Sequence, residues 1–179
     1  MKNLVTNPQE IERLAEELED ENWEFRVWIK EQYDFDDPKL NGMVWRLAGG
    51  LMEEIDCTAC GNCCRKTTTP VTEEDLEQLS FALSMDISTF QATYLERDEE
   101  SGGWELPAPC PFLEGNLCRV YYSRPENCRQ YPHLHNDFRA ASISRFNNTF
   151  ICPIVFNLFE LMKEELNWRP RSRRRRRRR

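Results

Sequence analysis

The feature that most constrains this chain is a run of four cysteines in eight residues, "CTACGNCC", at positions 57–64. Cysteines this crowded are not ordinary core residues, which pack singly as small apolar side chains. They indicate a disulfide framework, a reactive thiol site or a cage for metal. Four more cysteines follow, and the full set is Cys57, Cys60, Cys63, Cys64, Cys110, Cys118, Cys128 and Cys152.

The choice between disulfides and metal depends on the redox compartment. The opening stretch, "MKNLVTNPQEIERL", has neither the apolar segment nor the small-residue cleavage site of a secretory signal. The most apolar late stretch, residues 150–162, is too short to span a bilayer and is expected to be a core helix. We therefore expect a cytoplasmic protein with no membrane partner. Thiols stay reduced in that compartment, which favours metal or redox chemistry over disulfides.

The spacing of the first cysteines favours metal ligation. In a C-x2-C unit, a tight turn aims two thiolates at one ion, about 2.3 Å from each sulfur. Cys57, Cys60 and Cys63 extend this to C-x2-C-x2-C. That spacing matches the first three ligands of a bacterial iron–sulfur run, whose fourth ligand comes from elsewhere. The pattern predicts an iron–sulfur cluster or zinc as the cofactor and leaves the choice between them open.

Cys64 has the most open role of the eight cysteines. Adjacent Cys63 and Cys64 project differently, so one could join each of two sites. Eight thiols would fill two four-cysteine sites, although one filled site with spare cysteines is equally allowed by their number. A spare Cys64, next to Arg65 and Lys66, could be a low-pKa nucleophile or redox thiol of an enzyme. No catalytic residue is otherwise indicated.

A second group of ligands is expected around a predicted hairpin in "CPFLEGNLCRVY". Glu114, Gly115 and Asn116 suit its turn, so Cys110 and Cys118, at the two ends of the hairpin, should lie close together. Cys128 follows on a short helical turn within "SRPENCRQYP". These three cysteines could close over the first group.

The residues around the cysteines predict an environment that suits thiolates. Basic side chains that would lower thiolate pKa values and offset site charge gather there: Arg65, Lys66, Arg119, Arg124 and Arg129. Aromatic side chains are expected to shield the site rather than take part in chemistry: Trp104, Phe112, Tyr121 and Tyr131. His133 and His135 lack the spacing of zinc-finger ligands, so we expect them outside the ligand set.

The apolar pattern predicts a mainly helical α+β fold. We expect a small metal-nucleated cysteine-cluster domain with one short β-hairpin over residues 56–168 and an N-terminal helical extension over 1–55. The chain should end in a disordered, low-complexity tail over 169–179. Helices are expected at 8–32, 37–55 and 153–167, and a strand within 136–152. A helix pair is expected between residues 72 and 95, in which Thr72 with Asp75 resembles a capping box and Asp86 begins the second helix.

Charge is distributed unevenly along the chain. Nine of the 24 basic residues lie from Arg169 onward, so residues 1–168 carry 15 basic and 31 acidic side chains, a net charge of −16. Such a body would be repelled by nucleic acid, and any affinity for phosphate would come from the arginine tail. The acidic N-terminal helices are a possible protein-partner surface.

Several motifs together resemble a known family. "CTACGNCC", "CPFLEGNLCRVYYSRPENCRQYP" and the late Cys152-Pro153 pair resemble the YkgJ-type cysteine-cluster family, also called the CxxCxxCC or zinc- or iron-chelating domain. The resemblance runs from Cys57 to Cys152 and implies metal chelation by the eight cysteines, without assigning a metal or a reaction. A related cluster occurs in flagellin lysine N-methylases, but this sequence has no glycine-rich strand-to-helix loop for a methyl donor.

The leading functional hypothesis is therefore a metal-chelating protein with a structural, electron-transfer or sensing use. A thiol- or metal-dependent enzyme, redox or methylase-associated, is the first alternative. A nucleic-acid-binding zinc protein that uses its arginine tail is the second.

Overall fold

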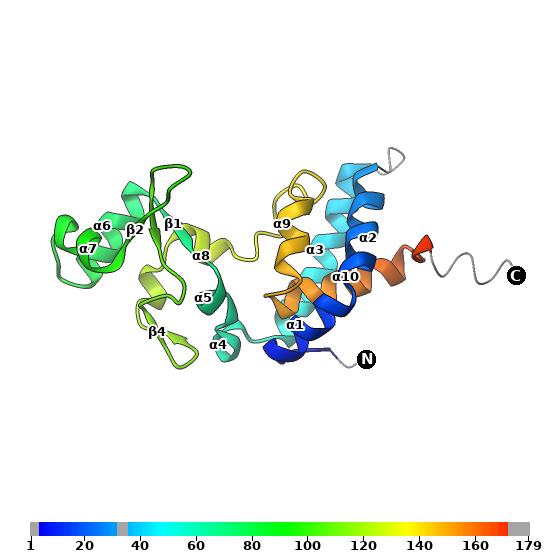
Figure 1. The fold of residues 1–179 in the computed structure, drawn as a ribbon, viewed down its shortest axis with the longest axis horizontal. Helices are drawn as coiled ribbons and strands as arrows, with labels where there is room; N and C mark the ends of the chain where they lie inside the picture. Colours follow the sequence, from blue (N-terminus) through cyan, green and yellow to red (C-terminus); the bar gives the residue numbers. More distant parts are fainter. Residues whose placement is uncertain (1–3, 32–35, 172–179) are drawn as a thin grey trace, which may run out of the picture. The chain divides into compact units, whose positions relative to one another are not determined.

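The structure is a computed structural model that describes residues 4–31 and 36–171. The chain divides into two compact units, which we treat separately. The helical unit comprises Met1–Asp56 and Pro132–Arg179, and the cysteine unit comprises Cys57–Tyr131. Figure 1 shows the elements of each unit along the chain.

The helical unit contains α1 (Pro8–Glu17), α2 (Glu19–Glu31), α3 (Asp37–Glu54), α9 (Ser142–Asn148) and α10 (Pro153–Glu165). Helix α10 packs against α3, α1 and α9, and these helices lie side by side in Figure 1. Its first half is apolar apart from Asn157, which bonds with the backbone of Val5, and Ile154 through Phe159 are all buried. Phe25 of α2 meets Phe159 with ring centroids 5.8 Å apart and Trp168 at 5.1 Å. The result is a continuous aromatic and aliphatic core.

Two of the predicted elements in this unit need correction. The helix expected over 8–32 is interrupted at Leu18, which ends α1 as its C-cap, and residue 32 lies outside the described residues. The strand expected within 136–152 is wrong, because Ser142–Asn148 form helix α9. Its buried side chains Ser142, Arg145 and Phe146 recur at the three- to four-residue spacing of a helix face.

The helix starts in the cysteine unit agree with the sequence prediction. In α6 (Glu73–Ala82), the Thr72 hydroxyl accepts from the Asp75 N–H and the Asp75 carboxylate accepts from the Thr72 N–H, each at 3.1 Å. This reciprocal arrangement is the predicted capping box. Asp86 caps α7 (Ile87–Tyr94), also as predicted.

Short antiparallel strands complete the cysteine unit. One sheet has the order β1-β3-β2, from β1 (Thr69–Val71), β3 (Trp104–Leu106) and β2 (Glu96–Arg97). The predicted hairpin is present as β4 (Leu113–Glu114) and β5 (Leu117–Cys118), and α8 (Glu126–Gln130) follows it. A small core lies beneath these elements and comprises Leu76, Leu79, Phe90, Leu95, Leu106, Phe112 and Val120.

The fold is thus mainly helical α+β, as predicted. No helix among residues 4–31 and 36–171 is long and apolar enough to cross a membrane. The contact-based units place residues 132–168 with the N-terminal helices, and the predicted division into 1–55, 56–168 and 169–179 stays a prediction. Within the predicted tail, residues 172–179 lie outside the described part of the chain.

Candidate metal centre

The cysteine run folds as two very short helices joined by a glycine. Helix α4 (Cys57–Cys60) and helix α5 (Asn62–Lys66) flank Gly61, whose backbone is left-handed with φ 60°. A Cβ atom at Gly61 would lie 3.0 Å from Nη1 of Arg65 and 3.2 Å from the Cα of Asn116. Glycine is required here both by its conformation and by the close approach of a second segment.

That second segment is the turn of the β4–β5 hairpin. Arg65 donates from Nη1 to the Cys60 carbonyl at 3.0 Å and from Nη2 to the Gly115 carbonyl at 2.5 Å. Its Nη2 also donates to Oδ1 of Asn116, whose Nδ2 donates to the Ala59 carbonyl at 2.7 Å. We call Arg65 and Asn116 the turn clasp, because together they bind the hairpin turn to the cysteine run.

The downstream cysteines are brought toward Cys64. The Cys110 N–H donates to the Cys64 carbonyl at 2.7 Å, and the Leu113 N–H donates to the Cys110 carbonyl at 3.1 Å. Leu113 in turn pairs with Cys118 across the hairpin. The hairpin therefore holds Cys110 and Cys118 near each other, as the sequence predicted.

Electrostatic coupling links Cys64 to three cysteines that are far from it in sequence. Burial raises the pKa values of Cys110, Cys118 and Cys128 most, and negative charge on Cys64 raises all three further; Cys118 also acts on Cys110 and Cys128. Such coupling requires that the sulfurs be close in space. We call Cys64, Cys110, Cys118 and Cys128 the four-thiol group.

The thiols of this group differ in acidity. A side-chain hydrogen bond with Cys63 lowers the pKa of Cys64 to about 6, with further help from the charges of Arg65 and Arg124. Burial raises the pKa of Cys110 to about 11. Burial also raises the pKa values of Cys118 and Cys128, and Arg124 acts in the opposite direction on both. Cys64 is thus the thiol that ionises first.

Two of the predicted basic neighbours act on the thiols. Arg65 and Arg124 do so, and Arg124 also lies 4.0 Å from the centre of the Tyr121 ring. Arg119 instead pairs with Glu114 at 3.8 Å. Arg129 pairs with Glu126 at 2.5 Å and donates to the Arg124 carbonyl. Arg65 and Arg124 are thus the predicted basic side chains with a described effect on these thiols.

The other four cysteines have less in common. Cys57 is exposed, Cys60 and Cys63 are half-buried, and Cys152 is buried as the N-cap of α10 in the helical unit. None of the eight cysteines, all within the described residues, is joined in a disulfide. In residues 4–31 and 36–171, no three His, Cys, Asp or Glu side chains are arranged to hold a metal ion. The four-thiol group is thus a set of neighbours rather than a formed cage.

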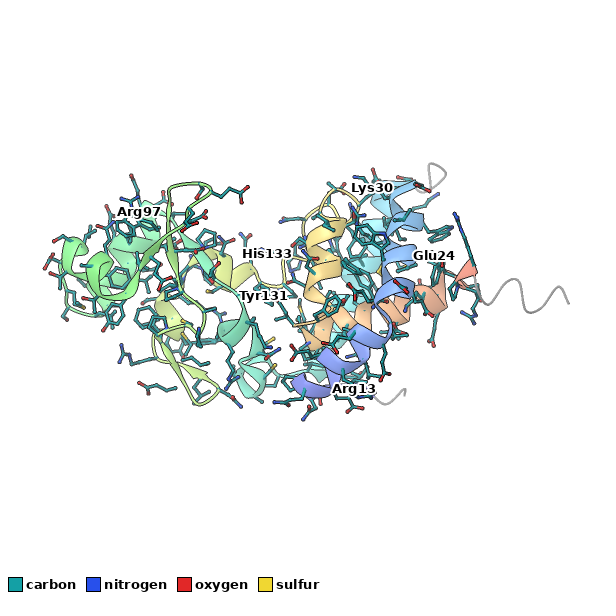
Figure 2. All side chains as sticks on the ribbon, in the orientation of Figure 1. Arg13, Glu24, Lys30, Arg97, Tyr131 and His133 are labelled. Atoms are coloured by element: carbon teal, nitrogen blue, oxygen red, sulfur yellow. The ribbon has the colours of Figure 1, made fainter. Side chains whose placement is uncertain are left out.

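The predicted aromatic shield is present in part. Phe112 is buried in the small core against which Cys110 and Cys118 pack, and Trp104 packs against the same core. Arg97, labelled in Figure 2, covers the Trp104 ring at 3.8 Å. Tyr121, by contrast, is exposed. Phe112 and Trp104 therefore belong to the same small core as Cys110 and Cys118.

The two histidines belong to the helical unit, whereas the four-thiol group belongs to the cysteine unit. His133, labelled in Figure 2, belongs to the helical unit, where burial and Arg145 lower its pKa. His135 is exposed in the same unit. Their place outside the ligand set stays a prediction.

Three residues that matter at this centre were not expected there from the sequence. Asn116 was expected only as part of a turn, although it also binds the Ala59 carbonyl. Thr69 places its Oγ1 3.7 Å from the Cys128 sulfur. Asp75 was expected only as a helix cap, although its carboxylate also reaches the Glu126 N–H at 3.0 Å. The local sequence signals were the turn for Asn116 and the capping box for Asp75.

Seven thiols in one small unit, with two arginines acting on them, define a thiol-rich site of the metal-chelating class. The chain belongs to the CxxCxxCC family, described as "Putative zinc- or iron-chelating domain", whose model matches residues 56–169. The resemblance expected from the sequence is therefore confirmed, and so is zinc or iron as the class of cofactor. The comparisons with curated proteins and with solved structures found no match.

Proposed function

We propose that the four-thiol group binds one metal centre, a zinc ion or an iron–sulfur cluster, with Cys64, Cys110, Cys118 and Cys128 as its ligands. The observation that carries the proposal is the Cys110 N–H bond to the Cys64 carbonyl at 2.7 Å, beside a hairpin that pairs Leu113 with Cys118; the electrostatic effect of Cys64 on all three downstream thiols agrees with it. Four thiolates are a complete ligand set for either centre. This proposal assigns Cys64 to the downstream group, although its thiol also makes a side-chain hydrogen bond with Cys63 of the C-x2-C-x2-C run.

The protein's own residues would favour binding in two ways. Cys64 is already largely ionised near neutral pH, so it would offer a thiolate to an incoming metal. Four thiolates around a divalent ion leave a charge of about −2, which Arg65 and Arg124 would offset. The half-buried thiols of Cys110, Cys118 and Cys128 would release their protons on binding, so affinity rises with pH.

Three of the remaining cysteines are proposed as a second ligand group. Cys57, Cys60 and Cys63 keep the spacing of three ligands in a bacterial iron–sulfur run. Cys152 is the eighth proposed ligand, and it belongs to the helical unit. The assignment of these four rests on spacing and on membership of the family.

The use that the fold supports best is structural. Helix α5, the hairpin and α8 each supply ligands to the four-thiol group, and each is too short to persist alone. A metal held by all three would link them and contribute directly to folding free energy. An iron–sulfur centre would add electron transfer or sensing to that structural use.

Two other partners stay proposals. The acidic N-terminal helices could bind a protein, and the arginine tail could bind nucleic acid. The described contact of the tail is the Arg171 N–H donating to Glu24 of α2 at 2.8 Å, which joins these two charged segments to each other. This contact favours neither partner.

Metal analysis of an anaerobic preparation, with visible and EPR spectra, tests the proposal. Zinc without colour, or iron with absorbance near 400 nm, would identify the centre. Serine variants of Cys64, Cys110, Cys118 and Cys128 should each lose the same metal equivalent. Retention of that equivalent by Cys64→Ser, together with its loss from the other three, would contradict the assignment of Cys64.

A further inference from the structure

Asp75 is the one buried acidic side chain among residues 4–31 and 36–171, and it is 3% exposed. Its two carboxylate oxygens serve different helices. Oδ2 accepts from the Thr72 N–H and completes the capping box of α6. Oδ1 accepts from the Glu126 N–H, 51 residues further along the chain, at 3.0 Å. A single buried carboxylate therefore binds the first turns of both α6 and α8.

Helix α8 needs an acceptor from outside itself. Its N-cap is Pro125, which makes no side-chain cap bond, so the first N–H groups of α8 have no acceptor in their own segment. The helix has only five residues, and helices that short are not stable alone. The Asp75 carboxylate supplies the missing acceptor and places negative charge at the helix start, where it is favourable.

The helix that Asp75 holds carries a proposed ligand. Cys128 lies in the middle of α8, with its sulfur 3.7 Å from Oγ1 of Thr69 on β1. The neighbouring Asn127 donates from Nδ2 to the Pro70 carbonyl at 3.5 Å. The thiol is a weak donor and the Asn127 bond is long, whereas the bond to the Asp75 carboxylate is charge-assisted and of ordinary length. Asp75 is therefore the firmest of these three attachments of α8.

We propose that Asp75 is a positioning residue for Cys128. It acts through the N-terminus of α8 to hold the thiol toward Cys64, Cys110 and Cys118, and it does not itself bind metal. The inference rests on the proposed function of the four-thiol group. It adds a residue, absent from the cysteine pattern, on which metal retention depends.

The test compares Asp75→Asn with two control variants in the full, metal-loaded chain. Thr72→Ala removes the hydroxyl half of the capping box and leaves both Asp75 acceptor bonds in place. Asp86→Asn alters an N-cap of α7 that has no bond to α8. The readouts are the rate of metal transfer to a chelator and the thiolate-to-metal absorption band.

Asp75→Asn should release metal about 10–100-fold faster, the usual cost of losing a residue that supports a ligand. Thr72→Ala and Asp86→Asn should release it at close to the wild-type rate. Equal acceleration by Thr72→Ala would show that Asp75 only caps α6, and it would overturn the proposal. An unchanged rate in Asp75→Asn would also overturn it.

A second pair of variants keeps the test available if Asp75→Asn does not fold. Glu126→Pro removes the N–H that Asp75 accepts, at a first helical position where proline is favoured. Glu126→Ala keeps that N–H and, like Glu126→Pro, loses the side-chain contacts with Arg129 and Gln130. Glu126→Pro should accelerate metal release and Glu126→Ala should not. Equal rates in these two variants would contradict the positioning role.

Experiments in the Cys128→Ser variant distinguish the role of Asp75 from the proposed metal binding by the four-thiol group. If Asp75 acts through Cys128, adding Asp75→Asn to Cys128→Ser should not change metal release further. A further acceleration in that background would overturn the positioning role. If Cys128→Ser itself binds and releases metal like the wild type, the proposed ligand set fails.

Discussion

Different interactions stabilise the helical unit and the cysteine unit. In the helical unit, α2, α3 and α10 run for 13, 18 and 13 residues, and α10 buries apolar side chains on nearly all sides. In the cysteine unit, α4, α5 and α8 have four or five residues, and no described strand exceeds three. Elements that short cannot bury enough surface to hold their own shape.

The comparison teaches where each unit's stability should come from. Each large apolar side chain buried in the helical unit contributes about 1.5–3 kcal/mol. The cysteine unit has a smaller core under α6 and α7, while its cysteine segments are tied by the turn clasp, by Asp75 and by the proposed metal. The two units should therefore respond differently to loss of metal and to loss of core packing.

Metal removal should produce the largest difference between the responses of the two units. Structural zinc contributes about 10–16 kcal/mol in small metal-dependent peptides, so chelation should open the cysteine segments while α3 and α10 stay folded. Hydrogen exchange of the whole chain, with and without a chelator, would show this as lost protection confined to 57–66 and 110–131. Unchanged exchange in those segments would show that the cysteine unit stands without metal.

Loss of core packing should give the opposite pattern. Phe159 is 1% exposed and lies against Phe25 and Phe138, so Phe159→Ala should lower the free energy of unfolding of the helical unit by about 3–5 kcal/mol. Metal content should not change. The control is Phe81→Ala, because Phe81 is 87% exposed on α6 and should contribute little. Denaturant unfolding with metal analysis checks both outcomes. Loss of metal in Phe159→Ala would show that metal binding depends on core packing in the helical unit.

Thiol acidity sharpens the assignment of Cys64. In metal-free protein at pH 7, Cys64 with a pKa of about 6 is mostly thiolate, whereas Cys110 with a pKa of about 11 is almost wholly protonated. After allowance for the lower nucleophilicity of the more acidic thiol, Cys64 should alkylate on the order of a hundredfold faster. The Cys64 rate should fall as pH drops through about 6. Peptide mass mapping of a timed reaction measures both rates, and equal rates would contradict the assigned environments.

The turn clasp can be tested at Gly61. Alanine in a left-handed conformation costs about 1–2 kcal/mol, and at Gly61 its Cβ would also press against Arg65 and Asn116. Gly102→Ala is the matched control, since Gly102 has φ 70° and a Cβ added there would meet no atom within 4 Å. Gly61→Ala should therefore lower the melting temperature and slow metal uptake more than Gly102→Ala does. Equal effects would mean that only backbone strain matters at Gly61.

Local signals predicted much of the fold. The Thr72 capping box, the Asp86 cap and the hairpin turn at Gly115 all depend on residues within a few positions of one another, and all three are present. Helix α9 was missed because an arginine is not expected at a buried position of a helix. Arg145 donates to the carbonyls of Pro132 and His133, and no local pattern signals these contacts. Polar side chains at its buried positions hid the helical period.

The candidate site was predictable in its residues and less so in its grouping. The spacing identified all eight cysteines as candidate ligands but could not show which thiols Cys64 would meet. That grouping depends on contacts across about 50 residues, through Arg65 to the hairpin turn and through Asp75 to α8. Hydrogen bonds over such separations leave no periodic trace in a sequence.

The most direct test of the central claim is alkylation of the metal-loaded protein, read out cysteine by cysteine before and after stepwise metal release. Cys64, Cys110, Cys118 and Cys128 should be protected together and should become reactive together as one metal equivalent leaves. Exposure of Cys64 in step with Cys57, Cys60 and Cys63, while the other three stay protected, would contradict the four-thiol site.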